Sequence, residues 1–266
     1  MGPLGLMEPT LKYHPCLVGT LTCGSYPARG QCQAGSLTGL GLEHRWIDEN
    51  SAKEGFIDLI IGKKINDHFS YYMVIECKRF GGGSWVFLNY DENNFNDSIL
   101  STRYKGKNDR KIIWERKNYF PESMLSSFCA VPGQNNKDTP MLERISEKLL
   151  NALESVALKK LLLDCSNTDN NLEYQAQFIP VIVTNAELIS CNFKPVDVDL
   201  LSGSLSKDKT KFENIPFVRF QKTFSTSYDT GTIPMNLIEA NKDSERTIWI
   251  VHAQGICNFL RQWEDK

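Results

Sequence analysis

The segment that constrains the fold most strongly is a long amphipathic helix predicted for residues 140–163. Its apolar residues recur at helical spacing at Leu142, Ile145, Leu149, Leu153, Val156 and Leu161. Thr139 and Pro140 provide a start signal, because proline is tolerated in the first helical turn. Runs rich in aromatic and β-branched residues lie on both sides of this helix. This order predicts an α/β fold with a mixed central β-sheet flanked by helices.

Three strands are expected before the helix, at residues 43–48, 54–62 and 69–80. The connection at residues 63–68 contains turn-forming residues, and glycines at residues 81–83 end the third strand. Such short connections predict an antiparallel meander.

The segments after this meander predict a less regular arrangement. Residues 89–140 are expected to form an insertion with short elements, and a polar loop at residues 164–171 is expected to end the helix. Further strands are expected at residues 177–193, 214–224 and 246–253, with a short terminal helix at residues 256–264.

Composition divides the chain into three parts. Residues 1–42 are rich in glycine and proline and are expected to form an irregular N-terminal leader. Residues 43–195 are expected to form the core, and residues 196–266 to add C-terminal strands and a helix to the same domain.

The charge composition restricts the partners of the chain. Its 266 residues include 30 basic and 32 acidic side chains, for a formal net charge of −2. This balance excludes a strongly cationic nucleic-acid coat, so a polyanion would have to bind to a local basic patch. No apolar run approaches the length of a membrane-spanning helix, and no signal peptide is visible. We therefore expect a cytoplasmic protein that does not enter a membrane.

Cysteines and histidines near the N-terminus suggest one kind of metal site. The candidate ligands are His14, Cys16, Cys23, Cys32 and His44. The cysteines are separated by 6 and 8 residues, a spacing that fits no compact zinc motif. We expect ordinary reduced thiols here, with a zinc-binding regulatory module as the alternative.

Three polar residues lie inside segments that otherwise predict buried strands. Asp58 lies in GFIDLIIG, and Glu76 and Lys78 lie in MVIECKR. Because residues i and i+2 of a strand share a face, Glu76 and Lys78 point the same way, with Cys77 on the other face. If the two strands are neighbours, Asp58 can lie on that face too, and two carboxylates and an amine then meet.

Two carboxylates beside a lysine predict a site for a divalent cation and phosphodiester hydrolysis. Hard oxygen ligands suit Mg²⁺ (or Mn²⁺), which is usually bound by one or two carboxylates together with waters and substrate phosphate. The lysine would orient or help to deprotonate the attacking water. The alternative is a salt network between Glu76 and Lys78 on a solvated sheet face, with Asp58 as an ordinary residue at a strand end.

The spacing of these residues resembles a known motif. Asp58 in IDLIIG, 17 intervening residues, and then Glu76 and Lys78 in IECK resemble the D…(D/E)-x-K motif of the PD-(D/E)XK nucleases, the restriction-endonuclease-like superfamily. Ile57 stands where the motif's name has proline. The resemblance implies Mg²⁺-dependent cleavage of nucleic acid, with Asp58 and Glu76 as metal ligands and Lys78 as the catalytic lysine.

The resemblance covers residues 43–195, with the helix at residues 140–163 and a strand at residues 177–184 in the expected order. It implies a restriction-endonuclease-like fold. Members of this superfamily tend to begin with a helix that bears an additional acidic residue. Glu43 is the best candidate here for that catalytic acid, and an ordinary surface carboxylate is the alternative.

A basic stretch at residues 103–117 is the strongest candidate for nucleic-acid binding. Its basic residues are Arg103, Lys105, Lys107, Arg110, Lys111, Arg116 and Lys117, against two acidic residues, for a local charge of +5. Tyr104 and Trp114 lie among them, and basic residues with aromatic neighbours suit phosphate contact and base stacking. A second stretch at residues 207–222 has a charge of +3. Solvated charged loops are the alternative for both stretches.

These features predict a Mg²⁺-dependent endonuclease that acts on DNA rather than RNA. By analogy with small members of the superfamily, we expect a role in prokaryotic (antiviral) defence or restriction. A homodimer or a partner protein is expected, because cutting both strands needs two sites. The alternative is a catalytically silent, nuclease-like binding or scaffold subunit of a larger assembly. The intact set of Asp58, Glu76 and Lys78 argues against that alternative, and the near-neutral charge favours it.

Overall fold

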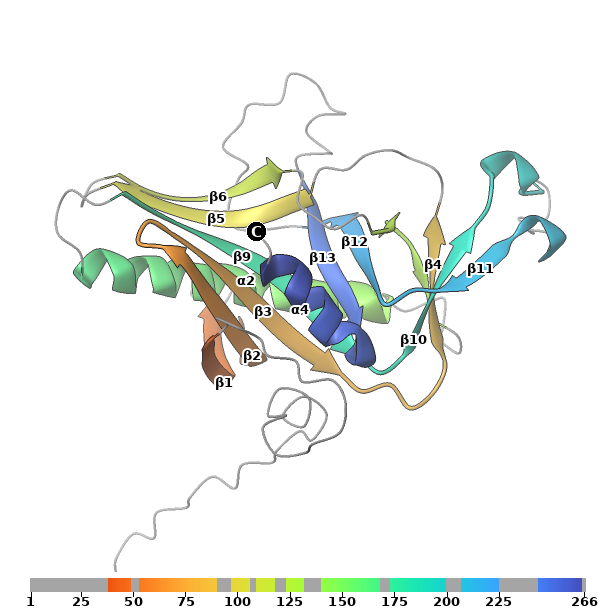
Figure 1. Ribbon diagram of the computed structural model, residues 1–266, viewed down its shortest axis with the longest axis horizontal. Helices are drawn as coiled ribbons and strands as arrows, with labels where there is room; N and C mark the ends of the chain where they lie inside the picture. Colours follow the sequence, from red (N-terminus) through yellow and green to blue (C-terminus); the bar gives the residue numbers. More distant parts are fainter. Residues whose placement is uncertain are drawn as a thin grey trace, which may run out of the picture. The chain divides into compact units, whose positions relative to one another are not determined.

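A mixed sheet of nine strands forms the centre of the described chain (Figure 1). The computed structural model describes residues 38–48, 53–89, 97–105, 109–117, 123–131, 140–167, 173–199, 207–224 and 244–264. All of them belong to one of two units, residues 34–266. The strands of the large sheet are β1 (Thr38–Asp48), β2 (Lys53–Asn66), β3 (Phe69–Lys78), β5 (Asp97–Lys105), β6 (Asp109–Lys117), β7 (Leu125–Ser126), β9 (Glu173–Thr184), β12 (Phe217–Thr223) and β13 (Glu245–His252).

A smaller sheet of four strands and two α-helices complete the described fold. The strands of the small sheet are β11 (Lys211–Asn214), β10 (Glu187–Asn192), β4 (Ser84–Asn89) and β8 (Cys129–Ala130), in that spatial order. The helices are α2 (Met141–Asn167) and α4 (Ile256–Glu264), with short 3₁₀ turns at Pro195–Asp197, Lys207–Lys209 and Ala253–Gly255. A mixed sheet flanked by helices confirms the predicted α/β class at this level.

The first three strands form the predicted antiparallel meander. β1 pairs with β2, and β2 pairs with β3, in both cases antiparallel. After β3 the chain forms β4 to β8 and α2 before it returns as β9. β9 lies parallel to β3, with Phe69 opposite Gln175 and Lys78 opposite Thr184. Parallel strands need a long connection, and α2 is its last element before β9.

Several element boundaries differ from the prediction. β2 continues to Asn66, so the turn-rich segment at residues 63–68 is mostly strand and only Asp67 and His68 turn. Pairing with β3 supplies the backbone hydrogen bonds that overcome the local turn preference. α2 likewise runs on to Asn167, and the single strand expected at residues 177–193 divides into β9 and β10 in different sheets.

The prediction of an insertion with short elements at residues 89–140 holds for the two-residue strands β7 and β8 but was wrong for β5 and β6. β5 and β6 form a long antiparallel hairpin, and β5 joins the central sheet by pairing antiparallel with β9, with Leu100 opposite Phe178. Ser98, Ser101 and Thr102 are buried within β5. These polar residues interrupt the apolar pattern by which a central strand is recognised in the sequence.

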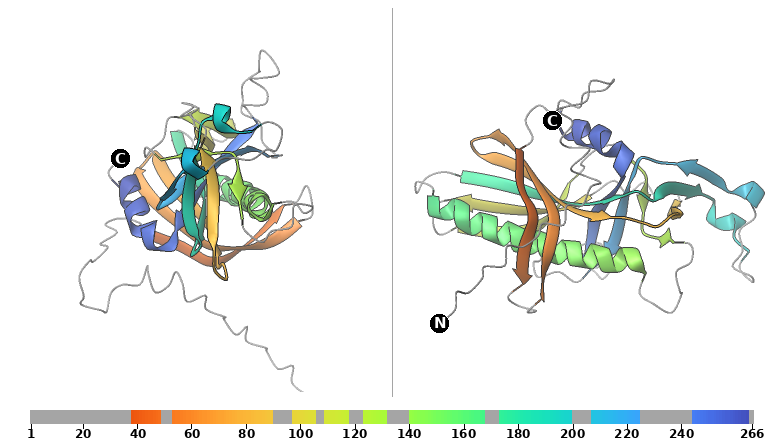
Figure 2. Two further views of the ribbon diagram at one scale, coloured as in Figure 1. Left: turned by 90° about the vertical axis from the view of Figure 1, so that its right-hand side faces the viewer. Right: turned by 90° about the horizontal axis from the view of Figure 1, so that it is seen from below.

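The C-terminal strands lie in the same sheet as the meander. β13 pairs parallel with β9, with Trp249 opposite Val181, and antiparallel with β12. α4 follows β13 and covers the face of the sheet opposite to α2 (Figure 2). Trp249 of β13 packs edge-on against Trp263 of α4, which also meets Tyr71 of β3, with ring centroids 6.1 and 5.9 Å apart.

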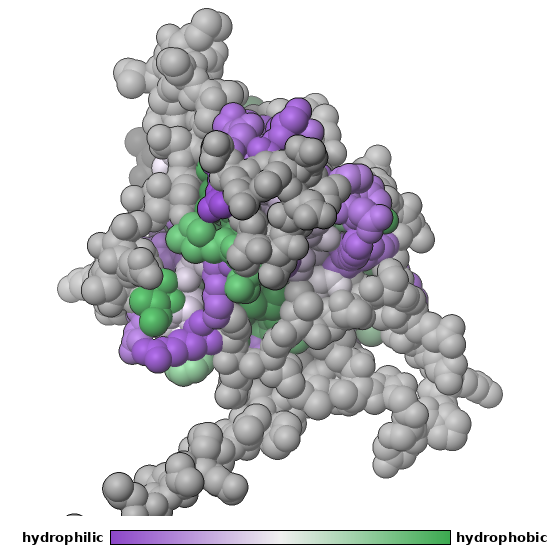
Figure 3. Space-filling view, turned by 90° about the vertical axis from the view of Figure 1, so that its left-hand side faces the viewer, coloured by the Kyte–Doolittle hydropathy of each residue, from purple (hydrophilic) through white to green (hydrophobic). Residues whose placement is uncertain are grey.

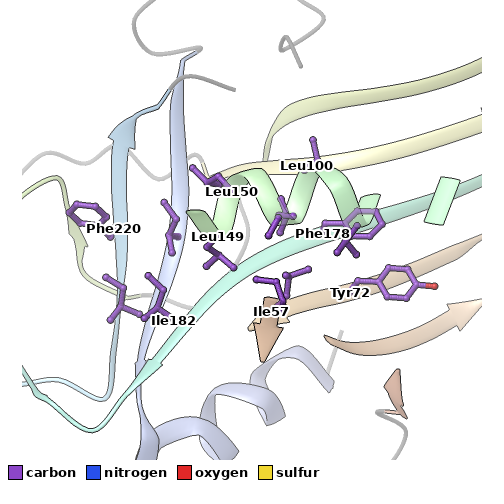
Figure 4. Packing of buried hydrophobic residues seen from close by; sticks show 14 of the residues in the cluster. Ile57, Tyr72, Leu100, Leu149, Leu150, Phe178, Ile182 and Phe220 are labelled. Carbon is purple, nitrogen blue, oxygen red and sulfur yellow. The ribbon is translucent and has the colours of Figure 1, made fainter. Parts of the chain in front are cut away.

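The main hydrophobic core lies between α2 and the sheet. Figure 4 shows Leu149 and Leu150 of α2 beside Ile57, Phe178 and Ile182 of the sheet strands, and all five are buried in one cluster. Burial of such side chains contributes about 1.5–3 kcal/mol each. This packing fixes the position of α2 against the sheet.

Hydrophobic side chains also reach the surface in several places. On the face in Figure 3, the coloured hydrophobic residues lie in separate groups among hydrophilic ones. Among the described residues, no helix has the length and apolar character needed to cross a membrane.

A buried ion pair connects β5 to β12. Arg219 Nη1 donates to Asp97 Oδ1 at 3.3 Å, and the two side chains are 3% and 1% exposed. Burial raises the pKa of Asp97 to about 7, although Arg219 acts to lower it. The folded protein therefore binds a proton here between about pH 4 and pH 7 that the unfolded chain has released.

We expect the free energy of unfolding to fall as pH rises from about 4 to 7, because of this proton. Asp97→Asn removes the titrating group and should flatten that part of the profile, measured by urea denaturation at several pH values. Asp67→Asn is the control, because Lys64 lowers the pKa of the exposed Asp67. Asp67 is therefore ionised in the folded and the unfolded protein across this pH range, and the variant should keep the wild-type slope. An Asp97→Asn profile with the slope of the wild type would contradict the assignment.

Candidate active site

The structure brings Asp58 of β2 close to Glu76 and Lys78, which lie at the end of the neighbouring strand β3. The pairing of β2 with β3 extends to Leu59 opposite Ile75. One residue further on, Oδ2 of Asp58 accepts a hydrogen bond of 2.6 Å from the backbone N–H of Cys77, the residue between Glu76 and Lys78. The Asp58 side chain thus serves as an acceptor for β3 where the paired ladder stops.

Glu76 is a buried carboxylate between two lysines. Its side chain is 4% exposed, and its Oε1 accepts hydrogen bonds from Lys78 Nζ at 2.6 Å and from Lys148 Nζ at 3.3 Å. The pair of Glu76 and Lys78 follows from their shared strand face, as predicted. The contact with Lys148 was not predicted, since Lys148 lies on α2 and meets Glu76 only after that helix packs on the sheet.

The second carboxylate oxygen of Glu76 is the least satisfied atom of the site. Oε2 is buried and has no hydrogen-bond partner among the described residues. An unsatisfied buried acceptor is costly, and more so when it carries charge. A bound cation or a bound water molecule would satisfy this oxygen.

Cys77 lies between the two charged residues of β3 but is not a nucleophile. Burial raises the pKa of its thiol strongly, and the neighbouring Asp58 and Glu76 carboxylates raise it further. The thiol therefore remains protonated at neutral pH, and thiols of this kind are unreactive.

A metal ion at this site would have to be bound by two carboxylates. In the part of the chain that the structure describes, no three His, Cys, Asp or Glu side chains gather closely enough to bind a metal ion. Mg²⁺ commonly takes only one or two protein carboxylates and completes its shell with water and phosphate. Asp58 and the unpartnered Oε2 of Glu76 fit this requirement.

Glu43 lies in the same row of the sheet. The β1–β2 pairs Leu42 with Leu59 and His44 with Ile57 place the backbone of Glu43 opposite Asp58. The side chains of Glu43 and His44 lie outside the described residues. The backbone position is compatible with the proposed auxiliary acid.

The basic stretch at residues 103–117 forms the β5–β6 hairpin, and most of its charges are paired. Its ion pairs are Arg103 with Glu115, Lys105 with Glu173, Lys111 with Asp109, Arg116 with Glu245, and Lys117 with Glu115. Two of these partners come from β9 and β13, so the local excess falls from +5 to +3. Arg110 is exposed, and Lys107 lies outside the described residues.

The aromatic residues of this hairpin cannot stack on bases in this conformation. Tyr104 and Trp114 are 4% and 1% exposed. Trp114 Nε1 donates to Glu154 Oε1 at 3.0 Å, and the guanidinium of Arg246 lies 4.6 Å from the centre of the Trp114 ring. These contacts make Trp114 part of the core, which corrects the expected role in stacking.

The second basic stretch also has internal partners. Lys209 pairs with Asp197, Lys211 with Glu213, Arg219 with Asp97 and Lys222 with Glu143. The candidate zinc ligands His14, Cys16, Cys23 and Cys32 lie outside the described residues.

The site where β2, β3 and α2 meet therefore contains two carboxylates and two lysines. One of the carboxylates, Glu76, has a buried oxygen without a hydrogen-bond partner among the described residues. Such a group of residues can bind a divalent cation and a phosphate side by side. No protein-family model, no curated protein and no solved structure matches this chain.

Proposed function

We propose that this protein is a Mg²⁺-dependent endonuclease of the PD-(D/E)XK, restriction-endonuclease-like superfamily that hydrolyses phosphodiester bonds of DNA. The observation that carries the proposal is the buried Glu76, with one oxygen free, beside Lys78 and near Asp58. A solvated surface salt network would not bury its carboxylate to 4% exposure. The alternative interpretation of the E-x-K pair is therefore weaker than the sequence alone suggests.

The order of elements around the site gives further support. An antiparallel meander and a strand parallel to β3 surround the three residues, with Glu76 and Lys78 at the carboxyl end of β3 and Asp58 within β2. This agrees with the mixed sheet and flanking helices that the resemblance implies. Ligands of open α/β sheets commonly bind beyond the carboxyl ends of strands, and Glu76 and Lys78 lie at that end of β3.

Each residue has a role in the proposed reaction. Asp58 and Glu76 would bind the cation, Glu76 through its free Oε2. Lys78, whose side chain is 33% exposed, would orient the attacking water and offset charge on the phosphate. When bound, Mg²⁺ would polarise the phosphate and stabilise the leaving oxygen.

The proposal extends to the setting of the enzyme. A homodimer or a partner protein would supply the second site needed to cut both strands, and the cytoplasm is the proposed location. A role in prokaryotic defence rests on analogy with small members of the superfamily.

The second candidate function is a catalytically silent binding or scaffold subunit. It is favoured by the pairing of most basic side chains on the β5–β6 hairpin.

The test is a cleavage assay of the full chain on plasmid, linear duplex, single-stranded DNA and RNA. Each substrate is incubated with Mg²⁺, with Mn²⁺ and with chelator, and Lys78→Ala is compared with Lys211→Ala. Lys211 pairs with Glu213 at the same two-residue strand spacing, but on the exposed β11. We expect cleavage of DNA that requires the metal and is lost only in Lys78→Ala. Cleavage that survives Lys78→Ala would contradict the proposed site, and cleavage of no substrate would favour the scaffold function.

A further inference from the structure

We infer that Lys148 of α2 is a second substrate-positioning residue of this site, one that holds Glu76 in the free protein and contacts a phosphate of the nucleic acid when a divalent cation occupies Glu76. The inference rests on the proposed function. It assigns a role to a charged residue that contacts Glu76 from α2, outside the strands that carry the predicted site residues.

Lys148 and Lys78 share a single oxygen of Glu76. Their ammonium groups lie 3.3 and 2.6 Å from Oε1, while Oε2 has no partner among the described residues. The carboxylate is buried, but the lysine side chains are 43% and 33% exposed. Both lysines thus extend from a buried anion to the surface, where a phosphate would approach.

Two contacts fix the direction of α2 relative to β3. Lys148 meets Glu76 near the end of β3, whereas Lys160, three turns later in the helix, lies 5.4 Å from the ring centre of Tyr72, earlier in β3. The helix therefore runs antiparallel to the strand.

This direction places further positive charge beside Lys78. Arg144 precedes Lys148 by about 6 Å along the helix, on the same face, and Lys78 follows Glu76 by about 6.6 Å along the strand. Arg144 is exposed. Lys78, Lys148 and Arg144 thus lie beside a site with two carboxylates, an arrangement that suits a polyanionic backbone on the surface next to the end of β3.

Lys148 and a divalent cation would compete for the same carboxylate. Removal of the Lys148 charge should then strengthen metal binding and weaken nucleic-acid binding. These opposite signs separate the inferred role from a structural one, because loss of structure would weaken both.

The test uses the full chain with Lys148→Met, Lys148→Arg and the control Lys159→Met. Lys159 is an exposed lysine of the same helix with no ion pair among the described residues. Calorimetry gives the Mn²⁺ affinity of the protein alone. Fluorescence anisotropy with Ca²⁺, which occupies the site without supporting cleavage, and separately with chelator, over a range of KCl concentrations, gives the affinity for a labelled DNA oligonucleotide.

We expect Lys148→Met to bind Mn²⁺ several-fold more tightly and the oligonucleotide about tenfold more weakly, with a salt slope smaller by about 1. Lys148→Arg should restore oligonucleotide binding, and Lys159→Met should match the wild type in both assays. Equal behaviour of the two methionine variants, or a parallel loss of both affinities in Lys148→Met, would overturn the inference and leave the proposed function intact. A wild-type protein that binds no oligonucleotide in either assay buffer, with chelator or with Ca²⁺, would overturn both.

Discussion

Glu76→Gln should slow metal-dependent DNA cleavage at least about 100-fold, because residues that merely support a metal ligand already account for about 10–100-fold effects. The substitution keeps the shape of the buried side chain but removes the negative charge that the cation and both lysines require. The measurement is the initial rate of plasmid cleavage as a function of Mg²⁺ concentration. A rightward shift of the Mg²⁺ dependence would identify Glu76 as a ligand.

Glu213→Gln is the matched control for this variant. Glu213 pairs with Lys211 at the strand spacing of Glu76 and Lys78, but its side chain is 47% exposed. It should retain wild-type activity. We expect Glu76→Gln to remain folded, since the lysines that lose their partner can turn to solvent. A Glu76→Gln protein with more than a tenth of the wild-type rate would exclude Glu76 from the reaction.

Phe259→Ala should give the largest loss of stability, about 3–5 kcal/mol in the free energy of unfolding. Phe259 of α4 is fully buried, with ring centroids of Trp249 and Phe217 at 5.3 and 5.6 Å. Its removal leaves a cavity beneath a helix of nine residues, which is too short to persist without packing. The measurement is urea denaturation followed by tryptophan fluorescence.

Phe212→Ala tests whether burial is the cause. Phe212 lies on β11 and is 57% exposed, so the same change of side chain should alter the free energy of unfolding by less than about 0.5 kcal/mol. Equal losses in the two variants would show that burial of Phe259 against the sheet does not explain its effect on stability. A red-shifted emission of Phe259→Ala below its unfolding midpoint would indicate that α4 leaves Trp249 while the sheet remains folded.

The sequence determined the local elements of this protein and the most informative part of its site. The meander, the long helix, the strand after it and the terminal helix each produce a pattern within a short window, because side-chain direction repeats every 2 residues in strands and every 3.6 in helices. The pairing of Glu76 with Lys78 is of the same kind, since both residues lie on one strand and share its face.

Only the tertiary structure decided which of these elements meet. The contact of Lys148 with Glu76 joins residues 72 positions apart, and β5 joins β9 by pairing Leu100 with Phe178. The basic hairpin loses much of its free charge to Glu173 and Glu245, which come from other strands, and Trp114 becomes part of the core. Periodicity reports which face of an element is apolar, but it does not report the element against which that face packs. That choice depends on how all the buried surfaces fit together.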